Sequence, residues 1–348
     1  MPAPAPARSA AARREHPAEG AAASRDQRRA RRASPEDILR KLEWTVLRRL
    51  DGILQGDYRT LFRGGGLDLA DLREYQYNDD VRHIDWNVTA RLQSPYVREY
   101  HEDREMAAWF LLDLSPSVDF GSQSTKKLHV ASRFVALLAR VLTRRGNRVG
   151  ALFYGHKVDR VVEPRSGRRH VLHLLDCILA RDTAAARAPT ATPTDLRELL
   201  QAAQGIARRR ALIFLVSDFF SVPGWTKDLA LLAQRHEVIA VRVFDPLESH
   251  LPDLGMVQLQ DAETGEQLFV DTHDARFRRR FAAQAAVREA RLRQDFSNAG
   301  VDALELATHD DLADAILRFA DMRKRRGQRH NHGATRQRAF ASHLESHR

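Results

Sequence analysis

Two short apolar runs in the middle of the chain each end at polar side chains. The run 107–112 is followed by Asp113, and the run 211–216 is followed by Ser217 and Asp218. Runs that are apolar at every position are typical of strands buried on both faces of a parallel sheet. In such sheets, ligands bind beyond the carboxyl ends of the strands. We therefore expect Asp113 and Asp218 to lie at that edge.

Helix-spaced apolar residues separate the expected strands. The clearest stripe consists of Leu128, Ala131, Val135, Leu138 and Leu142. Gly146 follows it, where a helix can end in a left-handed residue. The same patterns predict strands at 149–154, 158–162, 238–244 and 301–306, and helices at 168–180, 194–208, 225–235, 273–298 and 311–319. This alternation predicts an α/β fold with a doubly wound, mostly parallel sheet.

One later region departs from this alternation. Residues 256–260 and 267–270 alternate between apolar and polar on either side of a turn that contains Gly265. Two such runs around a glycine-containing turn predict an added β-hairpin near 256–270.

The part of the chain that precedes the first buried run is also different. A proline and two acidic residues after Ser34 predict the start of a helix. Residues 56–105 are dense in charged and aromatic side chains and contain three consecutive glycines. We expect 34–105 to form a helical and irregular segment that packs on a core domain at 106–322.

The net charge of +10 is concentrated at the two ends of the chain. Residues 1–33 carry a net +5 and residues 323–348 a net +7, which leaves the middle of the chain slightly acidic. Both ends are rich in arginine and lack apolar periodicity, so we expect disordered basic tails. The basic composition therefore gives no ground for specific nucleic-acid binding by the folded body.

Cysteine content and hydropathy indicate the compartment. Cys177 is the one cysteine, so the chain forms no internal disulfide, and its apolar helical surroundings favour a buried thiol. The longest apolar runs have six residues, far fewer than the roughly 20 that span a bilayer. We expect a cytoplasmic protein without a membrane span.

A set of oxygen-bearing side chains carries the candidate chemistry. Asp113, Ser115 and Ser117 form an Asp-x-Ser-x-Ser pattern directly after the first apolar run, and Asp218 follows the second. Thr194 stands where a further helix is expected to begin, and Thr192 is a rival for the same role. Hydroxyl and carboxylate oxygens suit Mg²⁺ or Mn²⁺, and no nitrogen or sulfur is present in the set to favour zinc.

This set resembles the metal-ion-dependent adhesion site of von Willebrand factor A domains. The resemblance implies that Ser115, Ser117 and Thr194 are hydroxyl ligands, and that Asp113 and Asp218 act as carboxylates directly or through water. An Asp-x-Ser-x-Ser pattern alone is weak, but the later threonine and the strand-end aspartate make the match specific.

A wider resemblance covers about residues 35–322. The segments at 66–77, 79–91 and 97–100, with the hairpin turn at 261–266, are similar to the family called domain of unknown function 58. Members of this bacterial family are often encoded beside MoxR-type AAA+ ATPases. The resemblance implies a protein-binding adaptor that works with such an ATPase, or with its client protein, in assembly or activation.

The chain departs from the family pattern in two places. Asn78 stands where glycine usually precedes the Asp-Asp pair, and asparagine tolerates the same turn better than most residues. Many family members also carry N-terminal membrane helices, and no such helix is predicted here.

Structural explanations compete with each functional one. The strand-end aspartates and serines could be helix caps. The cluster Asp79, Asp80, Arg82 and Asp85 could be catalytic, but a salt-bridge network that docks the N-terminal segment is favoured. His330 and His332 could bind a metal, although they lie in a tail expected to be solvated.

The enzyme alternative is a Mg²⁺-dependent phosphohydrolase that uses Asp113. Enzymes of the haloacid-dehalogenase type need a second aspartate two residues later, and Ser115 occupies that position. The sequence also has no G-x-S-x-G nucleophile motif and no phosphate-binding G-x-x-x-x-G-K-[ST] loop. These observations favour a binding protein over an enzyme.

Overall fold

The computed structural model describes residues 34–43, 71–76, 81, 84–99, 107–122, 125–181, 193–262 and 264–326. The predicted tail at 1–33 lies outside these residues, as does most of the tail predicted at 323–348. Residues up to 326 instead continue a helix that covers 312–326. Arg323 ties this helix to the sheet through ion pairs with Glu237 (2.9 Å) and Asp302 (3.0 Å). The folded body therefore extends to residue 326.

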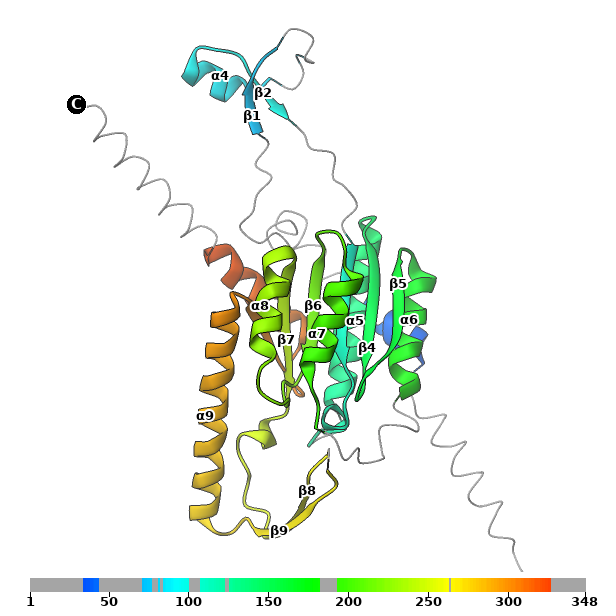
Figure 1. Ribbon diagram of the computed structural model, residues 1–348, viewed down its shortest axis with the longest axis vertical. Coiled ribbons are helices and arrows are strands. Elements are labelled where there is room, and N and C mark those ends of the chain that lie inside the picture. Colours follow the sequence, from blue (N-terminus) through cyan, green and yellow to red (C-terminus); the bar gives the residue numbers. More distant parts are fainter. Residues whose placement is uncertain are drawn as a thin grey trace, which may run out of the picture.

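A six-stranded sheet forms the centre of the molecule (Figure 1). In chain order its strands are β3 (Ala107–Asp113), β4 (Arg148–Tyr154), β5 (Val158–Arg165), β6 (Leu212–Ser217), β7 (Glu237–Phe244) and β10 (Asp302–Ala307). Their spatial order is β10-β7-β6-β3-β4-β5, and all neighbours are parallel except β4 and β5. The predicted doubly wound, mostly parallel α/β sheet is confirmed.

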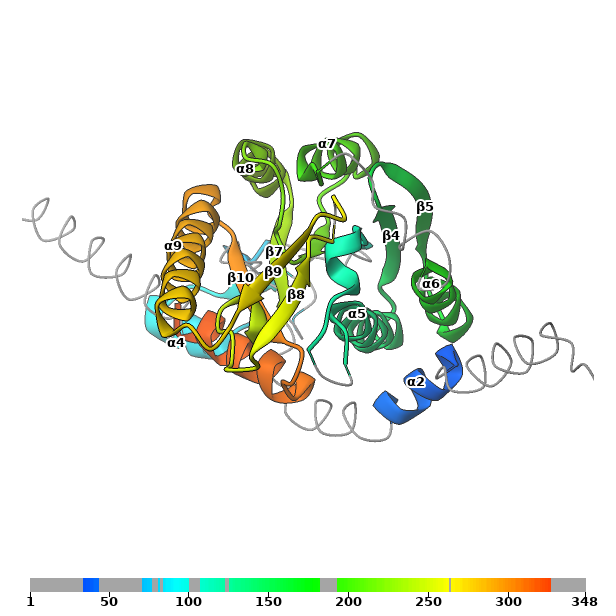
Figure 2. The ribbon, with the colours of Figure 1, turned by 90° about the horizontal axis from the view of Figure 1, so that it is seen from below.

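Helices cover both faces of the sheet (Figure 2). The helices on one face are α2 (Pro35–Leu42), α5 (Lys127–Arg144), α6 (Arg168–Arg181) and the helix over 312–326. The helices on the other face are α7 (Leu196–Ile206), α8 (Trp225–Arg235) and α9 (Ala275–Ala299). The predicted cap of α2 is present, because the Asp37 amide donates to Ser34 Oγ at 3.1 Å.

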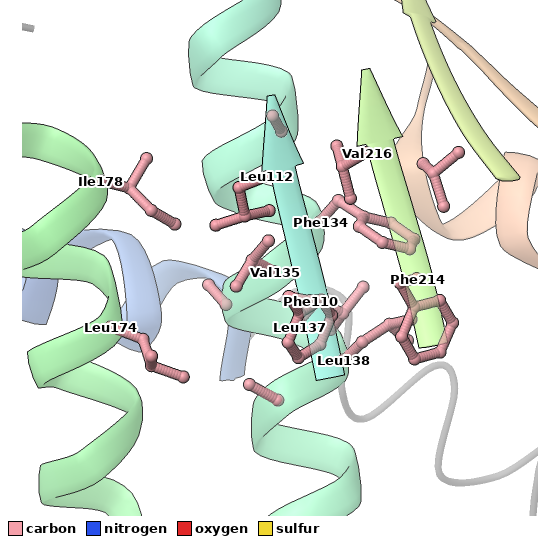
Figure 3. Packing of buried hydrophobic residues seen from close by; sticks show 14 of the residues in the cluster. Phe110, Leu112, Phe134, Val135, Leu137, Leu138, Leu174, Ile178, Phe214 and Val216 are labelled. Atoms are coloured by element: carbon pink, nitrogen blue, oxygen red, sulfur yellow. The ribbon is translucent and has the colours of Figure 1, made fainter. Parts of the chain in front are cut away.

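Successive side chains of the central strand enter two separate cores. Phe110 and Leu112 belong to the cluster that α5 covers, whereas Trp109 and Leu111 belong to the cluster under α7 and α8. Figure 3 shows the first cluster, in which Phe110 stacks on Phe214 of β6 with ring centroids 5.2 Å apart. A strand buried on both faces needs an apolar residue at each position, which explains the uninterrupted run.

The chain reverses its direction of travel across the sheet between β3 and β6. From β3 the chain moves outward through β4 to β5, and then returns to place β6 on the other side of β3. The pairing of Leu112 with Val216 brings the carboxyl ends of the two strands to the same level. This is a topological switch point, where doubly wound folds form their ligand sites.

Smaller elements complete the described chain. The predicted hairpin is present as β8 (Met256–Gln260) paired with β9 (Gln267–Asp271). Two short 3-10 helices, η3 (Pro116–Asp119) and η4 (Pro246–Glu248), follow β3 and β7. None of the helices in the described part of the chain is long and apolar enough to cross a membrane.

The N-terminal segment contains its own small unit. The strand β1 (Asp71–Glu74) pairs with β2 (Tyr96–Glu99), and α4 (Trp86–Leu92) lies between them in the sequence. The stretches that join this unit to α2 and to β3 lie outside the described residues. The packing of the whole segment 34–105 on the core stays a prediction, although α2 itself packs on α5 and α6.

Candidate metal centre

The candidate centre begins at the carboxyl end of β3. Asp113 is the last residue of that strand and is 1% exposed. Its Oδ1 accepts a hydrogen bond from the Ser115 amide at 3.0 Å, and its Oδ2 accepts one from Ser217 Oγ at 2.6 Å. Because Ser217 ends β6, this second bond joins the two strands on either side of the switch point.

The loop after β3 presents two hydroxyls together. Ser115 and Ser117 are buried, and their Oγ atoms lie 3.1 Å apart. Pro116 begins η3 directly after Ser115, and its fixed φ suits the first position of a helical turn. The sequence prediction that Asp113, Ser115 and Ser117 act from one loop agrees with this arrangement.

Thr194 approaches from the loop before α7. It is 3% exposed, and its carbonyl oxygen accepts from the Val222 amide at 2.9 Å and from Ser221 Oγ at 3.1 Å. These two bonds tie the Thr194 loop to the segment after β6.

The start of the helix α7 requires a correction. Thr194 was expected to open this helix, but Asp195 caps it, because the Arg197 amide donates to Asp195 Oδ1 at 3.0 Å. The helix therefore begins at Leu196 and leaves Thr194 in an extended loop. The rival Thr192 lies outside the described residues.

Asp218 is paired with a buried lysine that the sequence analysis missed. Lys127, the first residue of α5, places its Nζ 2.7 Å from Asp218 Oδ2 and 2.5 Å from Glu248 Oε1. The Lys127 side chain is 1% exposed. Asp218 Oδ1 accepts from the Phe220 amide at 3.1 Å. Both carboxylate oxygens of Asp218 therefore have hydrogen-bond partners.

Aromatic rings enclose the Lys127 ammonium. It lies 5.3 Å from the ring centroid of Phe220 and 5.8 Å from that of Phe120. The arrangement excludes water from the ion pairs and adds cation–π attraction. One unused signal in the sequence could have pointed to Lys127: a lysine in the first turn of a helix opposes the helix dipole, so an anionic partner nearby is favourable.

Burial and charge set the protonation of the centre. Burial and the neighbouring negative charge of Asp218 raise the pKa of Asp113 to about 7. Burial acts to lower the pKa of Lys127, but Asp218 and Glu248 outweigh it, so that pKa is raised and the ammonium is retained. Burial raises the pKa of Glu248, against the opposing effect of Lys127.

Asp113 is the carboxylate of the centre that has no internal cation. Its hydrogen-bond donors are a neutral hydroxyl and an amide, and no cationic side chain among the described residues pairs with it. An additional cation would remove the electrostatic cost of its charge. The Ser217 hydroxyl bonds to Asp113, and the Ser115 and Ser117 hydroxyls lie on the same loop; hydroxyl and carboxylate oxygens have the chemistry that Mg²⁺ and Mn²⁺ prefer.

The hydroxyls are essential to this fit. Within the described ranges, no group of three or more His, Cys, Asp or Glu side chains could hold a metal ion. A metal at this edge would therefore need hydroxyl ligands, such as those of Ser115, Ser117 and Thr194, as well as the aspartates.

The other candidate residues lie elsewhere or outside the described residues. Asp85 is buried and caps α4, since the Val88 amide donates to its Oδ1 at 3.3 Å. Its three partners in the acidic cluster, and both tail histidines, lie outside the described residues. Cys177 is buried in α6, as expected.

The fold and the site together define a class of protein. It is an α/β domain in which buried hydroxyl and carboxylate side chains lie at the ends of the strands that flank the switch point, consistent with the resemblance to von Willebrand factor A domains. The chain belongs to the family described as protein of unknown function DUF58, whose model matches residues 71–291.

Two mycobacterial proteins are similar to this chain in sequence. The uncharacterized protein Rv1480 of Mycobacterium tuberculosis is 37% identical over 287 residues, which cover 82% of this chain and 89% of that protein. The uncharacterized protein MAV169 of Mycobacterium avium is 38% identical over 47% of this chain and 94% of its own length.

Two solved structures are similar at low sequence identity. The conserved hypothetical protein BatB from Bacteroides thetaiotaomicron is 13% identical, with a TM-score of 0.38, over 63% of this chain and 99% of that one. The SpRpn10 VWA domain is 11% identical, with a TM-score of 0.34, over 61% of this chain and 94% of that one.

Proposed function

We propose that this protein is a metal-dependent protein-binding adaptor of the cytoplasm. In this proposal Ser115, Ser117 and Thr194 hold Mg²⁺ or Mn²⁺, together with Asp113 and Asp218. The single observation that carries it is the buried Asp113 carboxylate, which lies at a switch-point edge among hydroxyls and has no internal cation.

A carboxylate from another protein is the ligand that such a site would recruit. A divalent ion held mainly by neutral hydroxyls keeps a strong attraction for one more anionic oxygen. The family resemblance supports a MoxR-type AAA+ ATPase, or its client protein, as the source of that carboxylate. The adaptor would then bring ATPase and client together in the presence of the metal.

The phosphohydrolase alternative has less support. A nucleophilic aspartate must reach its substrate, whereas Asp113 is 1% exposed and both of its oxygens already accept hydrogen bonds. Asp113-dependent turnover of a small phosphate ester would reverse this preference.

A binding experiment with the purified ATPase tests the proposal. We expect the full-length chain to bind the ATPase with Mg²⁺, to lose it with EDTA, and to lose it in Ser115→Ala. Loss of a charge-assisted contact of this kind costs about 2–5 kcal/mol of binding free energy. The matched control is Ser297→Ala, a serine exposed on α9, which should bind like the wild type. Binding that is equally strong in EDTA would contradict metal dependence.

A further inference from the structure

The β8–β9 hairpin exposes large apolar side chains that no part of the described chain covers. Leu254, Met256, Leu268 and Phe269 are 62%, 69%, 61% and 68% exposed. Met256 pairs with Asp271, so Phe269 is its diagonal neighbour on the same hairpin face. Leu268 lies on the other face of the hairpin, so Met256 and Phe269 are the apolar pair that one face exposes. Exposed apolar side chains that are neighbours mark an interaction surface more strongly than scattered ones do.

The base of the hairpin is ordered, so these side chains stand on a fixed platform. Thr272 is buried, and its Oγ1 accepts from the Leu254 amide (2.9 Å) and donates to the Gly255 carbonyl (2.7 Å). Val270 is 6% exposed on the opposite face of the hairpin. The outer face is therefore presented in one orientation, which lowers the entropy lost on binding.

The helix that follows the hairpin, α9, is strongly basic in its N-terminal half. Residues 276–288 include five arginines and no acidic residue. Arg276, Arg279 and Arg280 are exposed, share one helix face, and form no ion pair with any residue that the structure describes. Arg278, by contrast, pairs with Asp253. Cations in the first turns oppose the helix dipole, so local stability does not explain them.

The hairpin and the first turns of α9 lie together beyond the carboxyl edge of the sheet. A helix of 25 residues is about 37 Å long, and Figure 1 shows the start of α9 projecting past the strands beside the hairpin. The buried residues of α9 are Ala285, Phe296 and Ala299, none in its first turns. Seen from below, the hairpin crosses the ends of β6 and β7 near η3 (Figure 2).

We propose that the hairpin–helix surface, formed by Leu254, Met256, Phe269, Arg276, Arg279 and Arg280, binds a protein segment in which acidic side chains alternate with large apolar ones. The arginines supply the charge complement of the acidic side chains, and the hairpin face supplies the apolar contact. This contact needs no metal, so it stands independently of the proposed adaptor function.

A lipid surface fits the hairpin less well. The hairpin turn, which would enter a membrane first, contains Asp261, Glu263 and Glu266. Anionic headgroups would repel these carboxylates, whereas a protein segment can lie along the strands and avoid the turn.

A binding assay in EDTA tests the proposal. The probe is a labelled synthetic peptide in which glutamate alternates with leucine and phenylalanine, and the control peptide carries lysine in place of glutamate. We expect fluorescence anisotropy to report saturable binding of the glutamate peptide only. Met256→Ser with Phe269→Ser should weaken it at least about tenfold, as truncation of anchor side chains does, and Arg279→Gln with Arg280→Gln should weaken it and reduce its salt dependence.

A control variant and a second ligand make the outcome decisive. Val287→Ser, which changes a 71% exposed residue outside this surface, should bind the peptide like the wild type. All variants should keep the wild-type melting temperature, because the altered side chains are exposed. Absent binding, or equal binding of the lysine peptide, would overturn the proposal. Binding to phosphatidylglycerol vesicles that the same variants abolish would assign the surface to a membrane instead.

Discussion

The two halves of the candidate centre contain similar carboxylates in opposite electrostatic situations. On the β6 and β7 side, Asp218 and Glu248 share the buried ammonium of Lys127. On the β3 side, Asp113 is equally buried but has only neutral donors among the described residues. One half is therefore internally neutralised, and the other half is prepared for a cation from outside. The comparison teaches that two carboxylates with similar burial can differ in counter-charge: Asp218 has a cationic partner inside the fold, whereas Asp113 has neutral donors.

Removal of the internal cation should produce the largest effect. Lys127→Met leaves the buried Asp218 and the partly buried Glu248 without a cationic partner and should lower the free energy of unfolding by about 3–5 kcal/mol. The adjacent Lys126 is the matched control, since its pair with Asp119 is 36% and 23% exposed, and Lys126→Met should cost about 0–1 kcal/mol. Urea denaturation measures both variants. Equal effects would show that the Lys127 pairs do not stabilise this half.

The negative charge of Asp113 should destabilise the metal-free protein, whereas the positive charge of Lys127 should stabilise it. Folding raises the pKa of Asp113 from 3.8 to about 7, so folding favours its protonated form. The stability gained from that protonation is complete below about pH 4 and is lost as the pH rises through about 7. In metal-free protein, Asp113→Asn should remove this loss and be more stable than wild type at pH 8, by up to about 4 kcal/mol. Asp218→Asn should instead destabilise the protein, because Lys127 loses one of its two anionic partners. Parallel pH dependences of wild type and Asp113→Asn would contradict the assignment.

Added Mg²⁺ should stabilise the wild-type protein, and this gain should depend on Asp113 and on the hydroxyls of the proposed site. At a Mg²⁺ concentration of ten times the dissociation constant, mass action adds about 1.4 kcal/mol to the free energy of unfolding. Calorimetric melting should show this gain in the wild type and not in Asp113→Asn or Ser117→Ala. A gain of equal size in Asp113→Asn would place the metal elsewhere.

The smallest expected change in stability distinguishes the roles of the neighbouring residues Thr194 and Asp195. Asp195→Ala removes a helix cap and should cost about 1 kcal/mol while the Mg²⁺ stabilisation is kept. Thr194→Val should abolish the Mg²⁺ stabilisation, and Thr192→Val should retain it. If Thr192→Val is the variant that loses the metal response, the rival threonine is the ligand.

Local patterns predicted most of the fold, because each pattern of apolar residues specifies a single helix or strand without reference to the rest of the chain. The uninterrupted apolar run before Asp113 specifies a strand buried on both faces, and the helix-spaced apolar stripe that starts at Leu128 specifies α5. The predicted hairpin was equally readable from alternation around Gly265. Boundaries were less accurate. The continuation of the last helix as far as residue 326 was not predicted, because arginines, which favour a tail by composition, here pair with Glu237 and Asp302.

The candidate centre was predictable in part. Asp113, Ser115 and Ser117 are close in sequence, so their common loop follows from the strand end that precedes them. The apolar run before Asp218 predicts its place at the same edge, whereas Thr194 could be assigned to the candidate site only through the family resemblance, because nothing local connects it to the strand ends. Lys127 and Glu248 escaped prediction altogether, since a charged residue at a helix end is ordinarily solvated.

The sequence by itself determined the alternation of buried strands and amphipathic helices, and with it the edge at which Asp113 and Asp218 had to emerge. Only the tertiary structure decided how the charges there are paired. Lys127 reaches Asp218 and Glu248 because the start of α5 lies against the ends of β6 and η4, which are separated from it by 91 and 121 residues. Coulomb energies depend on distance and burial, and both arise only when strands far apart in sequence become neighbours.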